Sequence, residues 1–275
     1  MWISIQTNVT SLLAQENLRV NNDFQSQTIQ RLTSGFRINA SGDDAAGLAV
    51  ANQFRSDIVE LRQGVRNAND GVSTLQIIDG GLSNITKILD RLKTLATEGA
   101  SETFEGDRDT VAQEFDDLLG EIDRQAANIG LDTAGSNYAQ ALGVWIGGGD
   151  AANSKVTVDL SAADVDSTGL GLAALGAGAT AADFEAAIAD VEAALTTVGT
   201  VQGTVGTGQN KLAYAIQLAQ SQISSYSAAE SRIRDADVAA EAANLTRAQV
   251  LQQASLAAMA QANAAPQAVL ALFRV

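Results

Sequence analysis

Long series of apolar residues, spaced three and four positions apart, dominate this sequence and limit what it can fold into. The clearest series lies within residues 72–95 and comprises Val72, Leu75, Ile78, Leu82, Ile85, Leu89, Leu92 and Leu95. This spacing places one apolar stripe along a helix, and a stripe of that length needs a partner helix to cover it. Proline breaks helices, and the one proline among the 275 residues, Pro266, lies near the C-terminus. The sequence therefore predicts a mainly α-helical protein of long antiparallel helices, as in a coiled coil.

Helical spacing recurs on either side of this series. It predicts an amphipathic helix over about 5–37, a long helix over about 45–99 and a shorter one over about 111–129, with Leu118 on the apolar face of the last. Because only a short polar break separates the long helix from the shorter one, the two are expected to pack antiparallel.

The C-terminal half contains two more predicted helices. Alternating steps of three and four resume over 184–226, where Gln202 and Gln209 fall at positions of the apolar stripe. From about Asp237 the chain is rich in Ala and Gln. Alanine favours a helix but offers little apolar area, so we do not expect this last helix to be stable alone.

The middle of the chain has a different character. Residues 136–178 contain two glycine-rich patches and, at 155–160, an alternation of polar and apolar residues that is typical of a strand. We expect one or two small β-hairpins joined by loops, with Trp145 as an anchor.

Residues 30–55, QRLTSGFRINASGDDAAGLAVANQFR, join the first two predicted helices. Gly35 is a natural stop for the first helix. Ser41 provides a hydroxyl for the N-cap of the next helix, with Asp44 three residues later, and Asp43 and Asp44 place negative charge at that helix N-terminus. The two aspartates are thus interpreted as capping residues.

Composition excludes several classes of function. The chain has no Cys and no His, which removes the usual zinc ligands, the commonest general base and the usual catalytic triads, so no catalytic residue, cofactor or metal is predicted. Its net charge of −15 has the wrong sign for binding nucleic acid. No stretch approaches the ~20 apolar residues of a membrane span, and the N-terminus does not read as a cleaved signal peptide.

Several motifs at both ends resemble those of bacterial flagellins, the subunits of the flagellar filament. They are SLLAQENL, the 30–55 segment, VRNANDGVSTLQIIDGGL, GEIDRQA and the run from SRIRDADVAAEAANL to APQAVL, over roughly 1–138 and 180–275. Because only about 40 residues separate the two helical parts, the resemblance is to a short form without outer domains.

The resemblance implies a layered organisation. The expected parts are an inner-core helix and spoke at 1–42, a rod domain formed by 43–138 and 181–236, a variable hairpin region at 139–180, and a C-terminal inner-core helix at 237–275. In this family the two terminal helices pair, fold on assembly and form the inner tube of the filament.

Residue roles also follow from the resemblance. The expected polymerisation residues of the inner core are Leu12, Leu13, Leu18, Phe24, Leu32, Leu245, Leu251, Met259, Leu270 and Leu272. The spoke and the start of the rod helix are expected at Arg31, Arg37, Ser41, Asp43 and Asp44.

The implied partners are other copies of the chain, a flagellar export chaperone and the filament cap, with delivery to the extracellular flagellum by the flagellar export apparatus. Host innate immune receptors are further candidate partners. Segment 30–51 matches the peptide that plant receptors detect, and an animal Toll-like receptor surface corresponds to Leu89, Arg91, Leu92, Leu95 and Glu114.

Two alternatives remain open from the sequence. A hook–filament junction protein shares the helical ends but usually differs around 43–47. A secreted helical adhesin that does not polymerise would also fit the composition and the heptads.

Overall fold

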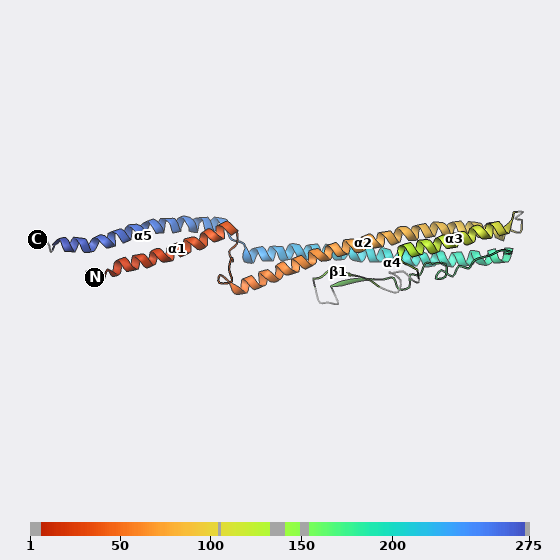
Figure 1. The fold of residues 1–275 in the computed structure, drawn as a ribbon, viewed down its shortest axis with the longest axis horizontal. Coiled ribbons are helices and arrows are strands. Elements are labelled where there is room, and N and C mark those ends of the chain that lie inside the picture. Colours follow the sequence, from red (N-terminus) through yellow and green to blue (C-terminus); the bar gives the residue numbers. More distant parts are fainter. Residues whose placement is uncertain (1–6, 104–105, 133–140, 149–153, 273–275) are drawn as a thin grey trace. The chain divides into compact units, whose positions relative to one another are not determined.

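A computed structural model describes residues 7–103, 106–132, 141–148 and 154–272, with side chains up to residue 264. The described residues form five helices and one two-stranded sheet (Figure 1). In chain order these elements are α1 (Val9–Ser34), α2 (Ala45–Ala100), α3 (Arg108–Ile129), β1 (Ala141–Trp145), β2 (Lys155–Asp159), α4 (Ala181–Arg234) and α5 (Val238–Leu272). The mainly helical class with paired terminal helices and a small hairpin is confirmed.

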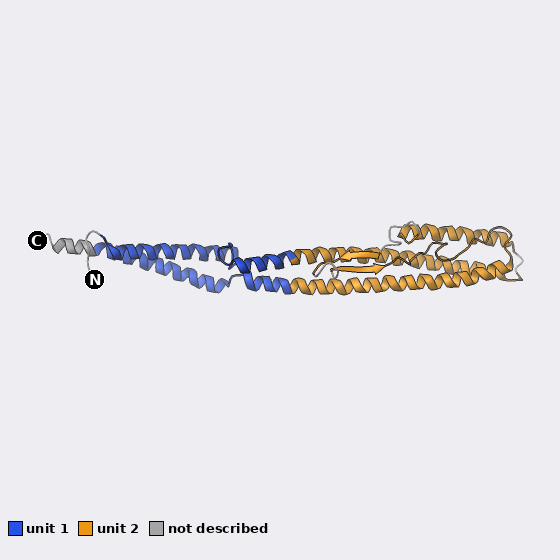
Figure 2. Cartoon of the chain, turned by 90° about the horizontal axis from the view of Figure 1, so that it is seen from below, with its two compact units in different colours: residues 1–56, 225–275 blue, residues 57–224 orange. Residues whose placement is uncertain are grey.

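The chain divides into two compact units (Figure 2). One unit contains both ends of the chain, residues 1–56 and 225–275, and the other contains residues 57–224. In the first unit, α1 and α5 lie side by side (Figure 1). The two ends of the sequence therefore meet, as the terminal motifs predict.

The second unit has an apolar core along α2, α3 and α4. The stripe predicted on α2 is buried from Leu75 to Leu95, and only Val72 at its start is half-buried. Of the two adjacent leucines on α3, Leu119 is buried, whereas the predicted Leu118 is half-buried. Either leucine satisfies helical spacing, so the packing partner decides between them.

Between Phe184 and Leu212, every second position of the stripe on α4 lies one residue before the predicted one, and the others are as predicted. Buried residues follow a heptad pattern of Phe184, Ala187, Val191, Ala194, Val198, Val201, Val205, Gly208, Leu212 and Ala219. Val201 and Gly208 occupy the stripe, and the predicted Gln202 and Gln209 are half-buried beside it. Small residues fit here because the hairpin packs closely, and a Cβ at Gly208 would lie 2.7 Å from Cγ1 of Val158.

A single antiparallel hairpin is present in the described part of the middle region. Strands β1 and β2 pair in register from Ala141 opposite Asp159 to Trp145 opposite Lys155. The prediction that Trp145 anchors the hairpin is wrong, since that side chain is 45% exposed. The buried anchors are Val144, Ile146 and Val158. Alternation along each strand sends these residues to the core face and leaves Trp145 on the other.

Candidate functional site

The pair of terminal helices in the first unit is built from local capping and a polar interface. Asn8 caps α1, because its Oδ1 accepts a hydrogen bond from the backbone N–H of Ser11 at 3.1 Å. Gly35 ends α1 as predicted, and its φ of 74° places it in the left-handed conformation. Asp237 caps α5 by accepting from the N–H groups of residues 239 and 240.

Burial on these two helices is reversed relative to an ordinary amphipathic helix. The buried residues of α1 are the polar Ser11, Asn21 and Thr28. The exposed large apolar residues of the pair are Val9, Leu12, Leu13, Val20, Phe24, Ile29, Val238, Val250, Leu251 and Leu256. Leu12 and Leu13 are 55% and 60% exposed, so the pair presents its apolar side chains to the surroundings.

The predicted inner-core residues fall into three groups. Leu12, Leu13, Phe24 and Leu251 are exposed. The half-buried members are Leu18, Leu32, Leu245 and Met259. The remaining two, Leu270 and Leu272, lie outside the residues whose side chains the structure describes.

An open apolar groove lies between α1 and α5. Its volume is about 460 Å³, and the groove is lined by Asn17, Val20, Asn21, Phe24, Leu251 and Ser255. Three of these side chains, Val20, Phe24 and Leu251, are large and apolar and belong to the exposed set. A groove of this kind can accept a nonpolar side chain of another helix.

The predicted spoke residues Arg31 and Arg37 connect the end of α1 to the start of α5 and to the end of α4. Arg31 forms an ion pair with Glu241 at 3.5 Å, and both side chains are largely buried. The N–H of Arg37 donates to the carbonyl of Arg234 at 2.6 Å, and its guanidinium donates to the carbonyl of Ile233 at 2.9 Å. These contacts tie the segment after α1 to the end of α4 within the first unit.

The aromatic ring of Phe36 supports the same connection. Its backbone forms an isolated β-bridge with Asp235, and the guanidinium of Arg234 lies 4.1 Å from the centroid of the ring. Neither Phe36 nor Arg234 is among the predicted spoke residues. An aromatic residue directly after a helix-ending glycine is the signal that could have indicated this contact.

The start of α2 differs from the predicted capping box. Helix α2 begins at Ala45, and Oδ1 of Asp44 accepts from the N–H of Gly47 at 2.8 Å, which makes Asp44 the N-cap. Asp43 closes the preceding turn, since its Oδ2 accepts from the N–H groups of Asn39 and Ala40 at 3.0 Å each. Ser41 is exposed and lies too far before the helix to cap it, so its predicted capping role is wrong.

Hydrogen bonding shifts the acidity of Asp43. The backbone N–H of Ala40, followed by that of Asn39, holds the pKa of its carboxyl below the usual value. Both donors stabilise the ionised form. Both aspartates of the predicted pair therefore have structural roles at the start of α2.

The residues of the candidate receptor surface on the rod comprise three buried leucines and one exposed ion pair. Leu89, Leu92 and Leu95 are at most 2% exposed. Arg91 and Glu114 are half exposed and joined by a salt bridge, with Nε and Nη2 of the arginine 3.0 and 2.5 Å from one carboxylate oxygen. The structure thus brings Arg91 and Glu114 together at the surface and places the three leucines beneath them.

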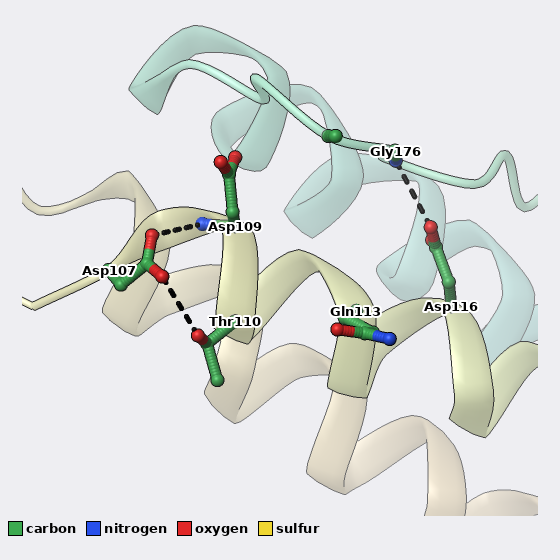
Figure 3. Close-up of a pocket in the computed structure, with 7 residues that line it drawn as sticks. Asp107, Asp109, Thr110, Gln113, Asp116 and Gly176 are labelled. Atoms are coloured by element: carbon green, nitrogen blue, oxygen red, sulfur yellow. Dashed lines mark hydrogen bonds between the residues drawn. The ribbon is translucent and has the colours of Figure 1, made fainter.

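A cleft lies between α3 and the loop after β2 (Figure 3). Asp107 bonds to the N–H of Asp109 and the hydroxyl of Thr110, as the dashed lines in Figure 3 show. Asp116 accepts from the N–H groups of Leu175 and Gly176 at 2.9 and 3.1 Å. These carboxylates are occupied by internal hydrogen bonds, so the cleft is a structural joint.

The same kind of joint repeats along α3. Asp109 accepts from the N–H of Gly178 at 2.7 Å, and Asp123 accepts from the N–H of Ser167 at 2.7 Å. Together with Asp116 these aspartates are seven residues apart in sequence, so they lie on one face of α3. They hold the loop 167–178 against the helix. Sequence reasoning missed this face, and the heptad spacing of the three aspartates was the available signal.

Among the residues that the structure describes, no group of acidic side chains is arranged to hold a metal ion. In the same part of the chain, no helix is both long enough and apolar enough to cross a membrane.

Two family models match this chain. One describes the bacterial flagellin N-terminal helical region and matches residues 5–133, and the other describes the bacterial flagellin C-terminal helical region and matches residues 188–273. Together these matches cover both helical parts of the chain and leave out the hairpin region.

Full-length relatives show the same similarity. A flagellin of Halalkalibacterium halodurans is 34% identical, covering 98% of this chain and 99% of that protein. A flagellar filament 33 kDa core protein of Treponema phagedenis is 31% identical, also covering 98% of this chain and 99% of that protein. Among solved structures, a Bacillus cereus flagellin is 25% identical with a TM-score of 0.47, covering 56% of this chain and 88% of that one.

Proposed function

This chain belongs to the bacterial flagellins, and we propose that the apolar side chains exposed on α1 and α5 are the surfaces through which its copies pack in the filament. As a flagellin it is a structural subunit of the flagellar filament, located in the flagellum, and not an enzyme. The observation that carries the proposal is the reversed burial of the terminal pair, with Asn21 buried and Leu13 60% exposed.

Exposed apolar area of this size is a driving force for association. Covering one leucine side chain stabilises an assembly by roughly 1.5 to 3 kcal/mol, and the described side chains of the terminal pair include ten large apolar residues that are exposed. Within the described part of α5, the one buried apolar residue is Ala248. Contacts between α1 and α5 alone therefore supply little apolar burial, which supports folding of the ends that is coupled to assembly.

We propose the following domain organisation. Residues 1–42 and 237–275 form the inner core with its spoke, residues 43–138 and 181–236 form the rod, and residues 139–180 form the variable region. In this scheme Arg31 and Arg37 hold the spoke, which their contacts with Glu241 and the carbonyl of Ile233 support.

Further partners are proposed from the family. An export chaperone and the filament cap would meet the chain on its way through the flagellar export apparatus to the filament tip. For host receptors, the accessible part of the rod surface is the Arg91–Glu114 pair, and Leu89, Leu92 and Leu95 support it from the core. Segment 30–51 is the second candidate recognition site.

The proposal is tested by seeded polymerisation. Purified full-length chain and a variant lacking 237–275 are mixed with short sheared filaments, sedimented and viewed by negative-stain electron microscopy. We expect long tubes of uniform diameter from the full chain and none from the truncated one. A full chain that stays monomeric with both ends already helical by circular dichroism would contradict the proposal and favour a helical protein that does not polymerise.

A further inference from the structure

The interface between α1 and α5 carries too little apolar burial to set how far the two helices are shifted along each other. Its buried residues are Ser11, Asn21 and Thr28 on α1 and, in the described part of α5, Glu241 and Ala248. Helix α5 is rich in Ala and Gln, so many shifted arrangements would bury similar side chains. Something other than apolar packing must choose one register.

Two asparagines of α1 reach backbone carbonyls of α5. Nδ2 of Asn21 donates to the carbonyl of Ala248 at 2.8 Å, in the buried part of the interface. Nδ2 of Asn8 donates to the carbonyl of Ala262 at 2.7 Å, while its Oδ1 caps α1. At ~1.5 Å rise per residue, the two asparagines and the two carbonyls are each about 20 Å apart along their helices. The spacings match on both helices.

In both contacts the accepting residue is an alanine. An asparagine side chain is short, so it reaches a helix carbonyl only where the opposing residue is small enough to let the backbones approach. A shift of α5 by three, four or seven residues, in either direction, places a larger residue opposite at least one asparagine. The residues that replace Ala248 in these shifts are Asn244, Gln252, Leu245, Leu251, Glu241 and Ser255.

The shift that brings Ser255 opposite Asn21 also brings Val269 opposite Asn8. None of these shifts by three, four or seven residues, which keep the same face of α5 toward α1, therefore offers two alanines. Other polar contacts agree with the observed register, including Ser11 Oγ donating to Asn263 Oδ1 at 2.8 Å and the Arg31–Glu241 pair.

We propose that Asn8 and Asn21 are the positioning residues that set the axial register of the terminal helix pair. Buried polar residues in coiled coils are known to select one register in this way. The inference rests on the proposed function, because the pair described is taken to be the one present in the assembled subunit. It goes beyond that function in assigning the register to two named side chains.

Disulfide mapping tests the register, because the chain has no cysteine of its own. Ser11→Cys is combined in turn with Asn263→Cys, Met259→Cys or Leu256→Cys, which report the observed register and shifts of about one and two turns. Filaments are pelleted, oxidised and separated by denaturing electrophoresis, so that cross-links within one chain are distinguished from dimers. In the otherwise unchanged chain we expect the 11–263 cross-link to predominate.

The decisive variant is Asn21→Leu, which keeps the side-chain volume and removes the donor. We expect its ratio of the 11–263 cross-link to the shifted cross-links to fall by at least about fivefold, because a buried carbonyl contact no longer favours one register. Asn21→Gln retains the amide donor and is expected to restore most of the preference. The control is Gln15→Leu, an amide-to-leucine change at an exposed position of α1 that does not line the groove between α1 and α5, which should leave the ratio unchanged.

Two results would overturn the proposal. One is an Asn21→Leu filament that keeps the original cross-link ratio, and the other is an equal loss of preference in Gln15→Leu. If Asn21→Leu does not assemble, the same cross-link ratio is measured in Asn8→Leu filaments, and an unchanged ratio there overturns the proposal. Failure of the unchanged chain to give pelletable filaments bears on the proposed function instead, since the register is read only in filaments.

Discussion

Gly64 of α2 lies directly against the backbone of Ile146 at the end of β1. A Cβ at position 64 would overlap the carbonyl oxygen of Ile146, which belongs to the chain backbone and cannot rotate away. We expect Gly64→Ala to displace the hairpin and lower the free energy of unfolding of the 57–224 unit by about 1 to 3 kcal/mol. Urea denaturation followed by circular dichroism measures this loss.

Gly120→Ala is the control for that substitution. A Cβ at Gly120 meets no atom within 4 Å, and the residue lies inside α3. Alanine is there expected to stabilise the protein by about 0.5 to 1 kcal/mol, because it favours the helix more than glycine does. Equal effects at positions 64 and 120 would show that the contact with Ile146 is not restrictive.

The candidate receptor surface on the rod contains residues that contribute very differently to stability. Leu92 is fully buried, so Leu92→Ala is expected to cost about 2 to 5 kcal/mol of stability. Arg91→Ala removes an ion pair whose side chains are 50% and 47% exposed, and is expected to cost at most about 1 kcal/mol. Thermal unfolding of the two variants compares them. A larger loss for Arg91→Ala would contradict the division into core and surface.

Leu13 tests the assembly surface of the terminal pair. Since its side chain is 60% exposed, Leu13→Gln should change the monomer little but remove apolar area that neighbouring subunits cover. A loss of about 1 to 2 kcal/mol per subunit corresponds to a critical concentration for polymerisation roughly 5 to 30 times higher. Sedimentation of seeded filaments measures that concentration. Gln27→Ala, at an exposed polar position of α1, serves as the control and should leave it unchanged.

The N-terminus of α4 predicts a pH dependence. Oδ2 of Asp183 accepts from the N–H and hydroxyl of Thr180 at 2.8 and 2.7 Å. The backbone N–H of Thr180, followed by its hydroxyl, lowers the pKa of Asp183 below its usual value. A lowered folded-state pKa gives stabilisation that is present above the unfolded pKa of ~3.9 and is lost as the pH falls through the folded value.

Asp183→Asn should therefore be less stable than the unchanged chain at about pH 7, and the difference should shrink below about pH 4. Urea denaturation at both pH values measures this difference. Asp190→Asn makes the same charge change two turns further into α4. A difference of the same size and pH dependence for Asp190→Asn would mean that the Thr180 contact is not its source.

Much of the fold follows from local patterns. The apolar steps from Leu75 to Leu95 are those buried on α2, because a heptad stripe of that length has one way to be covered by a partner helix. Gly35 ends α1 because glycine adopts the left-handed conformation without strain. Which of two adjacent apolar residues lies in a stripe was less predictable, because both fit the helical period. On α3, for example, Leu119 is buried instead of the predicted Leu118.

Capping was predictable in kind but not in detail. Both Ser41 and Asp44 are good N-cap residues, and the sequence does not indicate where the turn after α1 ends. The two hydrogen bonds of Asp43 to the preceding backbone close that turn and leave Asp44 at the first free N–H groups of α2. The Thr180–Asp183 box at the start of α4 was equally readable but unnoticed.

Periodicity and composition were sufficient to define the long helices, the break at Gly35, the hairpin region and the absence of residues for ordinary catalysis, because each depends on neighbours within a few turns of the chain. They could not show that α1 turns Asn21 toward α5 and Leu13 away from it, since a stripe of apolar residues is the same whether a neighbouring helix or another subunit covers it. Nor could they show Asp116 holding the backbone of Leu175 and Gly176. Those contacts join segments far apart in sequence, and three-dimensional packing alone brings them within hydrogen-bonding distance.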